Sequence, residues 1–100
     1  MEKLKVIFKK DKENNVIGFF PELPANLGKI VCYEHIGQHG EADMRYFHSL
    51  KRASETEYTA LLSELRSIYA EDNGECDPPI ELVVRQRFSY ADREKAYDWI

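Results

Sequence analysis

Cysteine, histidine and acidic residues lie close together between residues 32 and 43. Cys32, His35 and His39 are separated by two and then three residues, and a thiolate combined with imidazoles is a ligand set that zinc favours. A structural zinc site needs four ligands, and no spacing rule identifies the fourth here. Residues 32 and 35 also point to opposite faces of a regular strand. We therefore expect no metal and no cofactor, and interpret Cys32 as a small buried side chain.

The same segment contains the components of acid–base chemistry. His35 or His39 could act as a general base oriented by the carboxylate of Glu34, Glu41 or Asp43, and Cys32 could act as a nucleophile. No P-loop, nucleophile elbow or dinucleotide fingerprint accompanies these residues. We therefore assign no catalytic residue. A metal-dependent or histidine-assisted hydrolase that uses Cys32, His35, His39 and Asp43 is the alternative hypothesis.

A mixture of basic and aromatic side chains follows this segment. Its members are Arg45, Tyr46, Phe47, His48, Lys51 and Arg52. Cations neutralise phosphates and rings stack on bases, so the mixture suits nucleic acid. The net charge of −4 argues against this use, because binding to a phosphate backbone depends on concentrated Lys and Arg. The competing interpretation is that Tyr46 and Phe47 anchor the segment to the core.

Length and composition predict one folded domain that spans residues 1–100. Hydrophobic residues make up 43% of the chain and charged residues 32%, which is typical of a globular fold. No apolar run approaches the roughly 20 residues that span a bilayer, and the first residues do not resemble a signal peptide. We therefore expect a cytoplasmic protein with no membrane partner. Its two cysteines, Cys32 and Cys76, are expected to be free thiols.

Alternating apolar residues predict three strands before the first long helix. Leu4, Val6 and Phe8 alternate with lysines, which indicates a strand with one face on the core and the other in water. Residues 16–20 form the returning strand of a hairpin, and residues 29–36 form the third strand. On this third strand one face carries Ile30 and Cys32, and the other carries Val31 and Tyr33.

Residues 37–53 have no convincing periodicity. A connection of this length is unusual in a small domain and often marks a functional loop. The alternative is that residues 44–50 form another short strand.

The clearest predicted element is a helix that starts at Ser54. Ser54 and Glu57 have the spacing of a capping box, and Asn73-Gly74 would end the helix. Its apolar stripe consists of Tyr58, Leu61, Leu62, Leu65, Ile68 and Tyr69. Residues 80–85 form a further strand and residues 90–100 a short terminal helix. The predicted fold class is α+β in the order β-β-β-α-β-α, with a mainly antiparallel sheet covered on one face by the main helix.

Two local resemblances add to these predictions. Residues 20–24 (FPELP), 35–40 (HIGQHG) and 42–43 (AD) resemble a family of small proteins from bacterial mobile elements and gut bacteria. This likeness runs from about Val6 to Leu65, and it implies that His35, Gln38, His39 and Asp43 matter without assigning them a role.

The second likeness is to HicB-type antitoxins, which follow an N-terminal hairpin with an F-P-D-L-P-G stretch. Ala25 replaces the glycine, and a third strand and a long segment precede the helix, so the match is limited to residues 20–24. It would imply binding to a toxin or to DNA.

We therefore expect a noncatalytic binding module that presents residues 37–52 to a protein or nucleic-acid partner. The predicted contact residues are His35, Gln38, His39, Asp43, Arg45 and Phe47. A homodimer is also compatible with the sequence.

Overall fold

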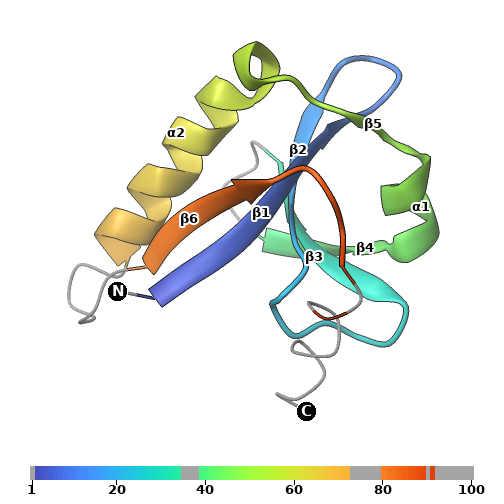
Figure 1. Cartoon of the computed structure of the whole chain (residues 1–100), viewed down its shortest axis with the longest axis horizontal. Helices are drawn as coiled ribbons and strands as arrows, with labels where there is room; N and C mark the ends of the chain where they lie inside the picture. Colours follow the sequence, from blue (N-terminus) through green and yellow to red (C-terminus); the bar gives the residue numbers. More distant parts are fainter. Residues whose placement is uncertain (1, 35–38, 73–79, 90, 92–100) are drawn as a thin grey trace.

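The computed structural model describes residues 2–34, 39–72, 80–89 and 91. Its elements follow one another along the chain as shown in Figure 1. They are β1 (Glu2–Lys10), β2 (Val16–Phe20), β3 (Lys29–Tyr33), β4 (His39–Asp43), α1 (Met44–Ser49), β5 (Lys51–Arg52), α2 (Glu55–Asp72) and β6 (Ile80–Arg85). Within the described ranges, no helix is both long and apolar enough to span a bilayer.

The strands form one sheet in the order β4-β3-β2-β1-β5, and β6 also pairs with β1. All pairings in this sheet are antiparallel except that of β1 with β6, which is parallel. Ile7 pairs with Phe19 of β2 on one side and with Arg85 of β6 on the other. Strands β5 and β6 therefore lie on the same side of β1, one beside each end of it. The α+β class and the mainly antiparallel sheet are confirmed.

The expectation of a long loop over residues 37–53 is wrong for the described part of that segment. His39–Asp43 is a strand that pairs with β3, and the next residues form helix α1 rather than the alternative short strand. Strand β4 lies at the sheet edge, and nearly all of its residues are exposed. Its sequence therefore lacks the alternation of apolar and polar residues that marks a half-buried strand. The third strand ends at Tyr33, earlier than predicted. Its expected last residues, 35 and 36, lie outside the described residues.

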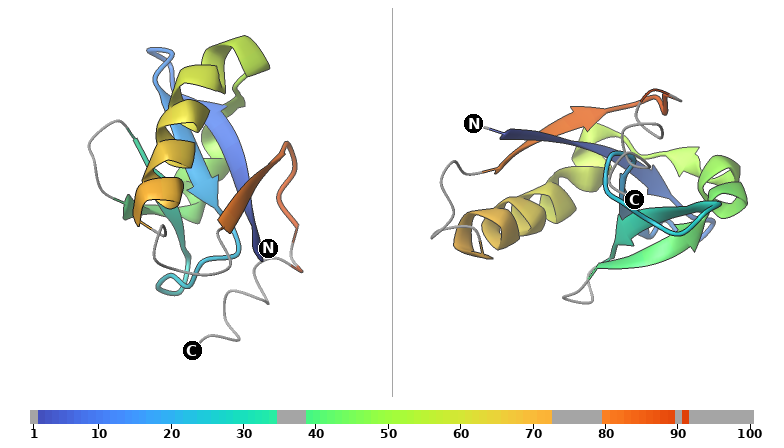
Figure 2. Two further views of the ribbon diagram at one scale, coloured as in Figure 1. Left: turned by 90° about the vertical axis from the view of Figure 1, so that its left-hand side faces the viewer. Right: turned by 90° about the horizontal axis from the view of Figure 1, so that it is seen from below.

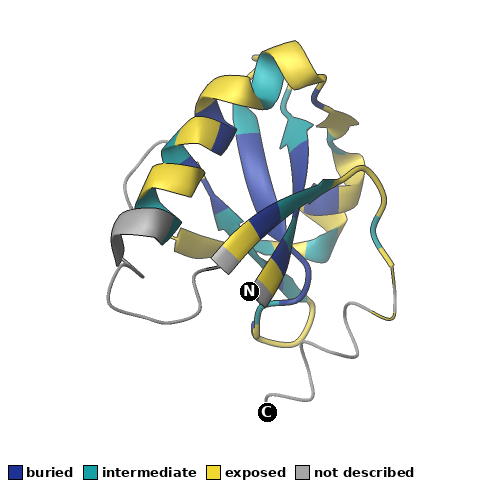
Figure 3. Ribbon diagram, turned by 60° about the vertical axis from the view of Figure 1, so that its left-hand side comes forward, coloured by how far each residue is buried: buried dark blue, intermediate teal, exposed yellow. Residues whose placement is uncertain are grey.

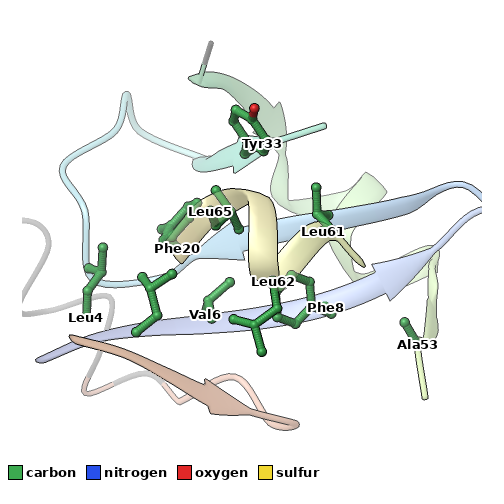
Figure 4. Packing of buried hydrophobic residues seen from close by; sticks show 10 residues of the cluster. Leu4, Val6, Phe8, Phe20, Tyr33, Ala53, Leu61, Leu62 and Leu65 are labelled. Carbon is green, nitrogen blue, oxygen red and sulfur yellow. The ribbon is translucent and has the colours of Figure 1, made fainter. Parts of the chain in front are cut away.

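Helix α2 covers one face of the sheet and forms the larger core. The predicted stripe is confirmed, since Leu61, Leu62 and Leu65 are buried against β1 and β2 (Figure 4). A methyl group on Gly18 of β2 would lie 3.3 Å from both Leu65 and Phe8, so the helix approaches the sheet closely because this residue has no side chain. The outward side of α2 is exposed (Figure 3).

The opposite face of the sheet carries a second core, which corrects the expectation that this side of the first strand faces water. Ile7, Ile17, Phe19 and Ile30 are buried there together with Phe47 of α1. The rings of Phe19 and Phe47 meet edge to face with their centroids 4.9 Å apart. Helices α1 and α2 therefore lie on opposite sides of the sheet (Figure 2).

The start of α2 confirms half of the predicted capping box. The Glu57 carboxylate accepts a hydrogen bond from the backbone N–H of Ser54 at 2.9 Å. The Ser54 hydroxyl donates to the same carboxylate, while the N–H of Glu57 bonds to the Ser54 carbonyl. The predicted stop at Asn73-Gly74 and the predicted helix at 90–100 lie outside the described residues, apart from residue 91.

Candidate functional site

Asp43 is a structural cap. Its Oδ1 accepts a hydrogen bond from the backbone N–H of Arg45 at 2.7 Å, and its Oδ2 lies 3.8 Å from the Lys29 ammonium. His39 is at the other end of the same strand, roughly 13 Å away at about 3.3 Å per residue. The strand therefore separates Asp43 from His39, which is one of the two histidines that it could have oriented.

His39 lies among aromatic rings on the α2 side of the sheet. Its Nε2 is 3.0 Å from the hydroxyl of Tyr69, and its ring is within 5.1 to 5.8 Å of the rings of Tyr33, Phe20 and Tyr69. Burial raises the pKa of Tyr69 to about 12, so this hydroxyl stays protonated. These contacts attach β4 to helix α2.

Cys32 lies on the opposite face of the sheet from His39. Tyr33 pairs with His39 across the β3–β4 ladder, whereas Cys32 pairs with Gly40, and Cys32 packs against the second core. The predicted alternation of the third strand is thus confirmed over Ile30 to Tyr33. Burial, followed by the charges of Glu34 and Glu41, raises the pKa of the Cys32 thiol and makes it a poor nucleophile. Among the described residues no three cysteine, histidine or acidic side chains are placed to hold a metal.

The remaining predicted contact residues fall into two groups. His35 and Gln38 lie outside the described residues. Arg45 is exposed on α1, but Phe47 is only 1% exposed, which corrects its expected role as a partner contact. The competing interpretation, in which Tyr46 and Phe47 anchor the segment to the core, is confirmed for Phe47. Its neighbour Tyr46 remains 42% exposed.

The structure reveals a basic depression on the α1 side of the sheet, with a volume of about 360 Å³. It lies where β1, β5 and the chain after β6 meet. Its lining residues are Lys9, Phe47, His48, Arg52, Gln86, Arg87 and Phe88. None of these described lining residues is acidic, although the whole chain carries a net charge of −4. The described lining of this depression is therefore positively charged.

Two cations stand directly opposite each other in the wall of the depression. Lys9 of β1 is paired in register with Arg52 of β5. The Lys9 ammonium donates a hydrogen bond to the carbonyl of Phe47 at 3.0 Å and lies 4.1 Å from the centre of the Phe47 ring. Burial, and then the nearby Arg52 charge, lower the pKa of Lys9. Within the described part of the chain, neither cation forms an ion pair.

The next pair of residues along the β1–β5 ladder, on the other face of the sheet, also consists of two cations, but a carboxylate compensates their charge. Lys10 is opposite Lys51, but the Lys10 ammonium forms a 2.6 Å ion pair with Glu57 of α2. The like charges there are relieved by a carboxylate of the protein. Among the described residues, the Lys9 and Arg52 pair has no such carboxylate.

Residues that follow β6 complete the depression, and the sequence did not predict their part in it. The Phe88 ring lies 5.7 Å from Phe47 and 5.7 Å from His48, meeting both edge to face. Arg85 is in register with Ile7, so it shares the face of Lys9 and Arg52. The run Arg85-Gln86-Arg87-Phe88 has the same basic and aromatic character as residues 45–52, and that signal could have identified it.

A larger depression of about 740 Å³ lies beside the β1–β2 turn. Lysines line it together with Asp11 and Glu13, so its charge is mixed. The Asp11 carboxylate accepts hydrogen bonds from the N–H groups of Glu13 and Asn15, which hold the turn. The Asp11 carboxylate therefore has a structural role, and the mixed charge of this depression makes the smaller basic depression the better candidate site.

No family model matches the chain, and neither a curated protein nor a solved structure does. The resemblances to the mobile-element family and to HicB-type antitoxins therefore stay predictions.

Proposed function

We propose that the chain is a noncatalytic binding module that holds an anionic partner in the basic depression between α1, β5 and the residues after β6. The observation that carries this proposal is the register pairing of Lys9 with Arg52, with no acidic side chain in the described lining. Like charges directly opposite each other on adjacent strands are destabilising. A bound anion would remove this repulsion, so the pair favours the bound state over the free one.

The surroundings of the pair support a preorganised site. Phe47 holds α1 against the second core, and Asp43 caps the same helix. Lys9 is fixed by its bond to the Phe47 carbonyl. Groups that are already ordered lose less conformational entropy when a partner binds. The depression therefore suits recognition without a large rearrangement.

The alternative of a hydrolase gains no support from the described residues. Cys32 and His39 lie on opposite faces of the sheet, and Asp43 is at the far end of β4. The fourth residue of that hypothesis, His35, lies outside the described residues.

The cytoplasmic location and the homodimer also stay predictions.

The proposal can be tested with inorganic tripolyphosphate as a probe of anion binding, followed by amide NMR spectra. We expect the largest shifts at Lys9, His48, Arg52 and Phe88. Arg52→Gln should weaken binding about tenfold, since a hydrogen bond to a charged group contributes about 1.5 kcal/mol.

Arg66→Gln is the matched control, because Arg66 is exposed on α2 and removal of its charge changes the net charge equally. It should leave binding unchanged. Shifts centred on the β1–β2 turn, or equal effects of the two variants, would show that the depression is not the site.

A further inference from the structure

We propose that the anionic partner is a single strand of nucleic acid, with phosphates at Lys9, Arg52 and Arg87 and a base against Phe88 and His48. This inference rests on the proposed function and specifies its ligand. The proposed ligand is a phosphodiester chain with accessible bases, and both single-stranded DNA and single-stranded RNA fit this description.

The aromatic part of the depression favours a nucleic acid over an acidic peptide. Phe88 is half-buried, and the edge-to-face contact with exposed His48 places two rings beside the cations. A carboxylate can use the cations but gains little from the rings. A base can stack on aromatic side chains and on the planes of arginine guanidinium groups. The combination of arginines with rings is therefore better matched by a nucleotide.

The size and position of the depression favour a single strand over a duplex. Its volume of about 360 Å³ is at the lower end of the range of about 300–1,000 Å³ for small-ligand sites. Such a recess can admit one unstacked base, whereas bases inside a duplex are not available to enter it. Arg85, on the same face, extends the positive charge along the sheet edge.

The acidic balance of the chain predicts how strong this binding is. A net charge of −4 repels a polyanion at long range, whereas the cations of the depression attract it at close range. Binding should therefore be modest and sensitive to salt. For single strands, the logarithm of affinity falls with the logarithm of salt concentration by about 0.7 per phosphate contacted.

The experiment measures fluorescence anisotropy of the full chain with labelled strands of about 12 nucleotides, within the usual range of site sizes. The probes are oligo-dT, oligo-U, an abasic strand with the same number of phosphates, and a polyglutamate peptide of equal charge. Oligo-dT or oligo-U should bind at least about fivefold more tightly than the abasic strand, because each stacked base contributes that much or more.

Two variants assign the binding to the depression. Arg52→Gln should reduce the salt slope by about 0.7, which corresponds to one lost phosphate contact. Phe88→Leu keeps an apolar side chain for packing but removes the ring, so it should narrow the gap between oligo-dT and the abasic strand. Circular dichroism of each variant confirms that it is folded.

Equal binding of the abasic strand would overturn the inference, because no base would be recognised. Polyglutamate binding as tight as that of the strands, and sensitive to Arg52→Gln, would also overturn it while leaving the proposed anion-binding function in place. If no probe binds, tripolyphosphate included, both proposals fail.

Discussion

Lys9 and Arg52 lie directly opposite each other on strands β1 and β5, and the Lys9 ammonium donates to a carbonyl of α1 rather than to a carboxylate. The equivalent pair on the other face, Lys10 and Lys51, is relieved by Glu57. The β1–β5 ladder thus contains two cation pairs. A carboxylate of the protein compensates Lys10 and Lys51, whereas Lys9 and Arg52 form no ion pair among the described residues. Because the Lys9 and Arg52 pair has no such carboxylate to stabilise it, we consider the basic depression a candidate binding site.

Because Phe47 is buried in the core and Tyr46 is not, alanine substitutions at these two neighbours should differ greatly in their effect on stability. Phe47→Ala should destabilise the fold by about 3–5 kcal/mol, because it removes a buried ring that packs against Phe19. Tyr46→Ala should destabilise the fold clearly less than Phe47→Ala does, since Tyr46 is 42% exposed and Phe47 is 1% exposed. Urea unfolding measures both. Similar losses for the two variants would contradict the described packing of α1.

The close approach of α2 to the sheet predicts that a methyl group at residue 18 is harmful. Gly18→Ala should cost about 1–3 kcal/mol, because its Cβ would crowd Leu65 and Phe8 at 3.3 Å. Gly40→Ala is the matched control, since a Cβ there has no neighbour within 4 Å among the described atoms. Thermal unfolding of the two variants compares them. A Gly18→Ala protein as stable as the control would show that the helix packs more loosely than described.

The Glu57 carboxylate should give the fold an acid-sensitive contribution. Its bond with Lys10, followed by its bonds with Ser54, lowers the pKa of Glu57 from 4.5 to about 2. A carboxyl whose pKa is lower in the folded state stabilises above its unfolded value and loses that effect as pH falls. Glu57→Gln should therefore be less stable than the natural chain at neutral pH, and the gap should close between about pH 4.5 and about 2.

Urea midpoints measured across that range follow the difference, and Lys10→Met should show the same convergence. A gap that stays constant down to about pH 2 would mean that the ion pair does not shift the titration.

Tyr69 predicts the opposite behaviour in alkali. Its folded pKa is about 12 and its ordinary value is 10.0, so between these values the unfolded chain loses the proton first. The contribution of Tyr69 to stability should therefore fall as pH rises from about 10 to about 12. Tyr69→Phe lacks this titration and its hydrogen bond to His39, and should lose about 0.5–1.5 kcal/mol at neutral pH.

Phenolate absorbance during an alkaline titration provides the check. The step at highest pH should be missing from the Tyr69→Phe protein. An unchanged titration curve would show that Tyr69 is not the buried hydroxyl.

Strong local signals made the scaffold predictable. Helix α2 has both a capping pair, Ser54 and Glu57, and a continuous apolar stripe, and both are present in the structure. Strands β1 to β3 were predictable because they are rich in apolar residues and largely buried. Helix α1 has six residues, of which only Phe47 is buried, so no periodicity could reveal it. Strand β4 is exposed at the edge and gave no pattern for the same reason.

The candidate site could not be assembled from sequence, because it depends on contacts between distant segments. Lys9 and Arg52 meet only because β5 pairs with the end of β1, more than 40 positions away in the sequence. Phe88 joins them from beyond the end of β6. The net charge averages over the whole chain and concealed a surface without described acidic side chains. The basic and aromatic character of residues 45–52 was visible, but the position of Phe47 inside the core was not.

The most direct test of the proposed site is to measure stability and anion binding together for Arg52→Glu. A glutamate opposite Lys9 replaces repulsion with attraction, so the free energy of unfolding should rise by about 0.2–1 kcal/mol without ligand. Tripolyphosphate affinity should fall at least about tenfold in the same protein, since a cation is lost and an anion added. Higher stability together with weaker tripolyphosphate binding would support the proposal that the Lys9 and Arg52 pair binds an anion. A variant that is less stable than the natural chain, or that binds tripolyphosphate as well, would contradict the account.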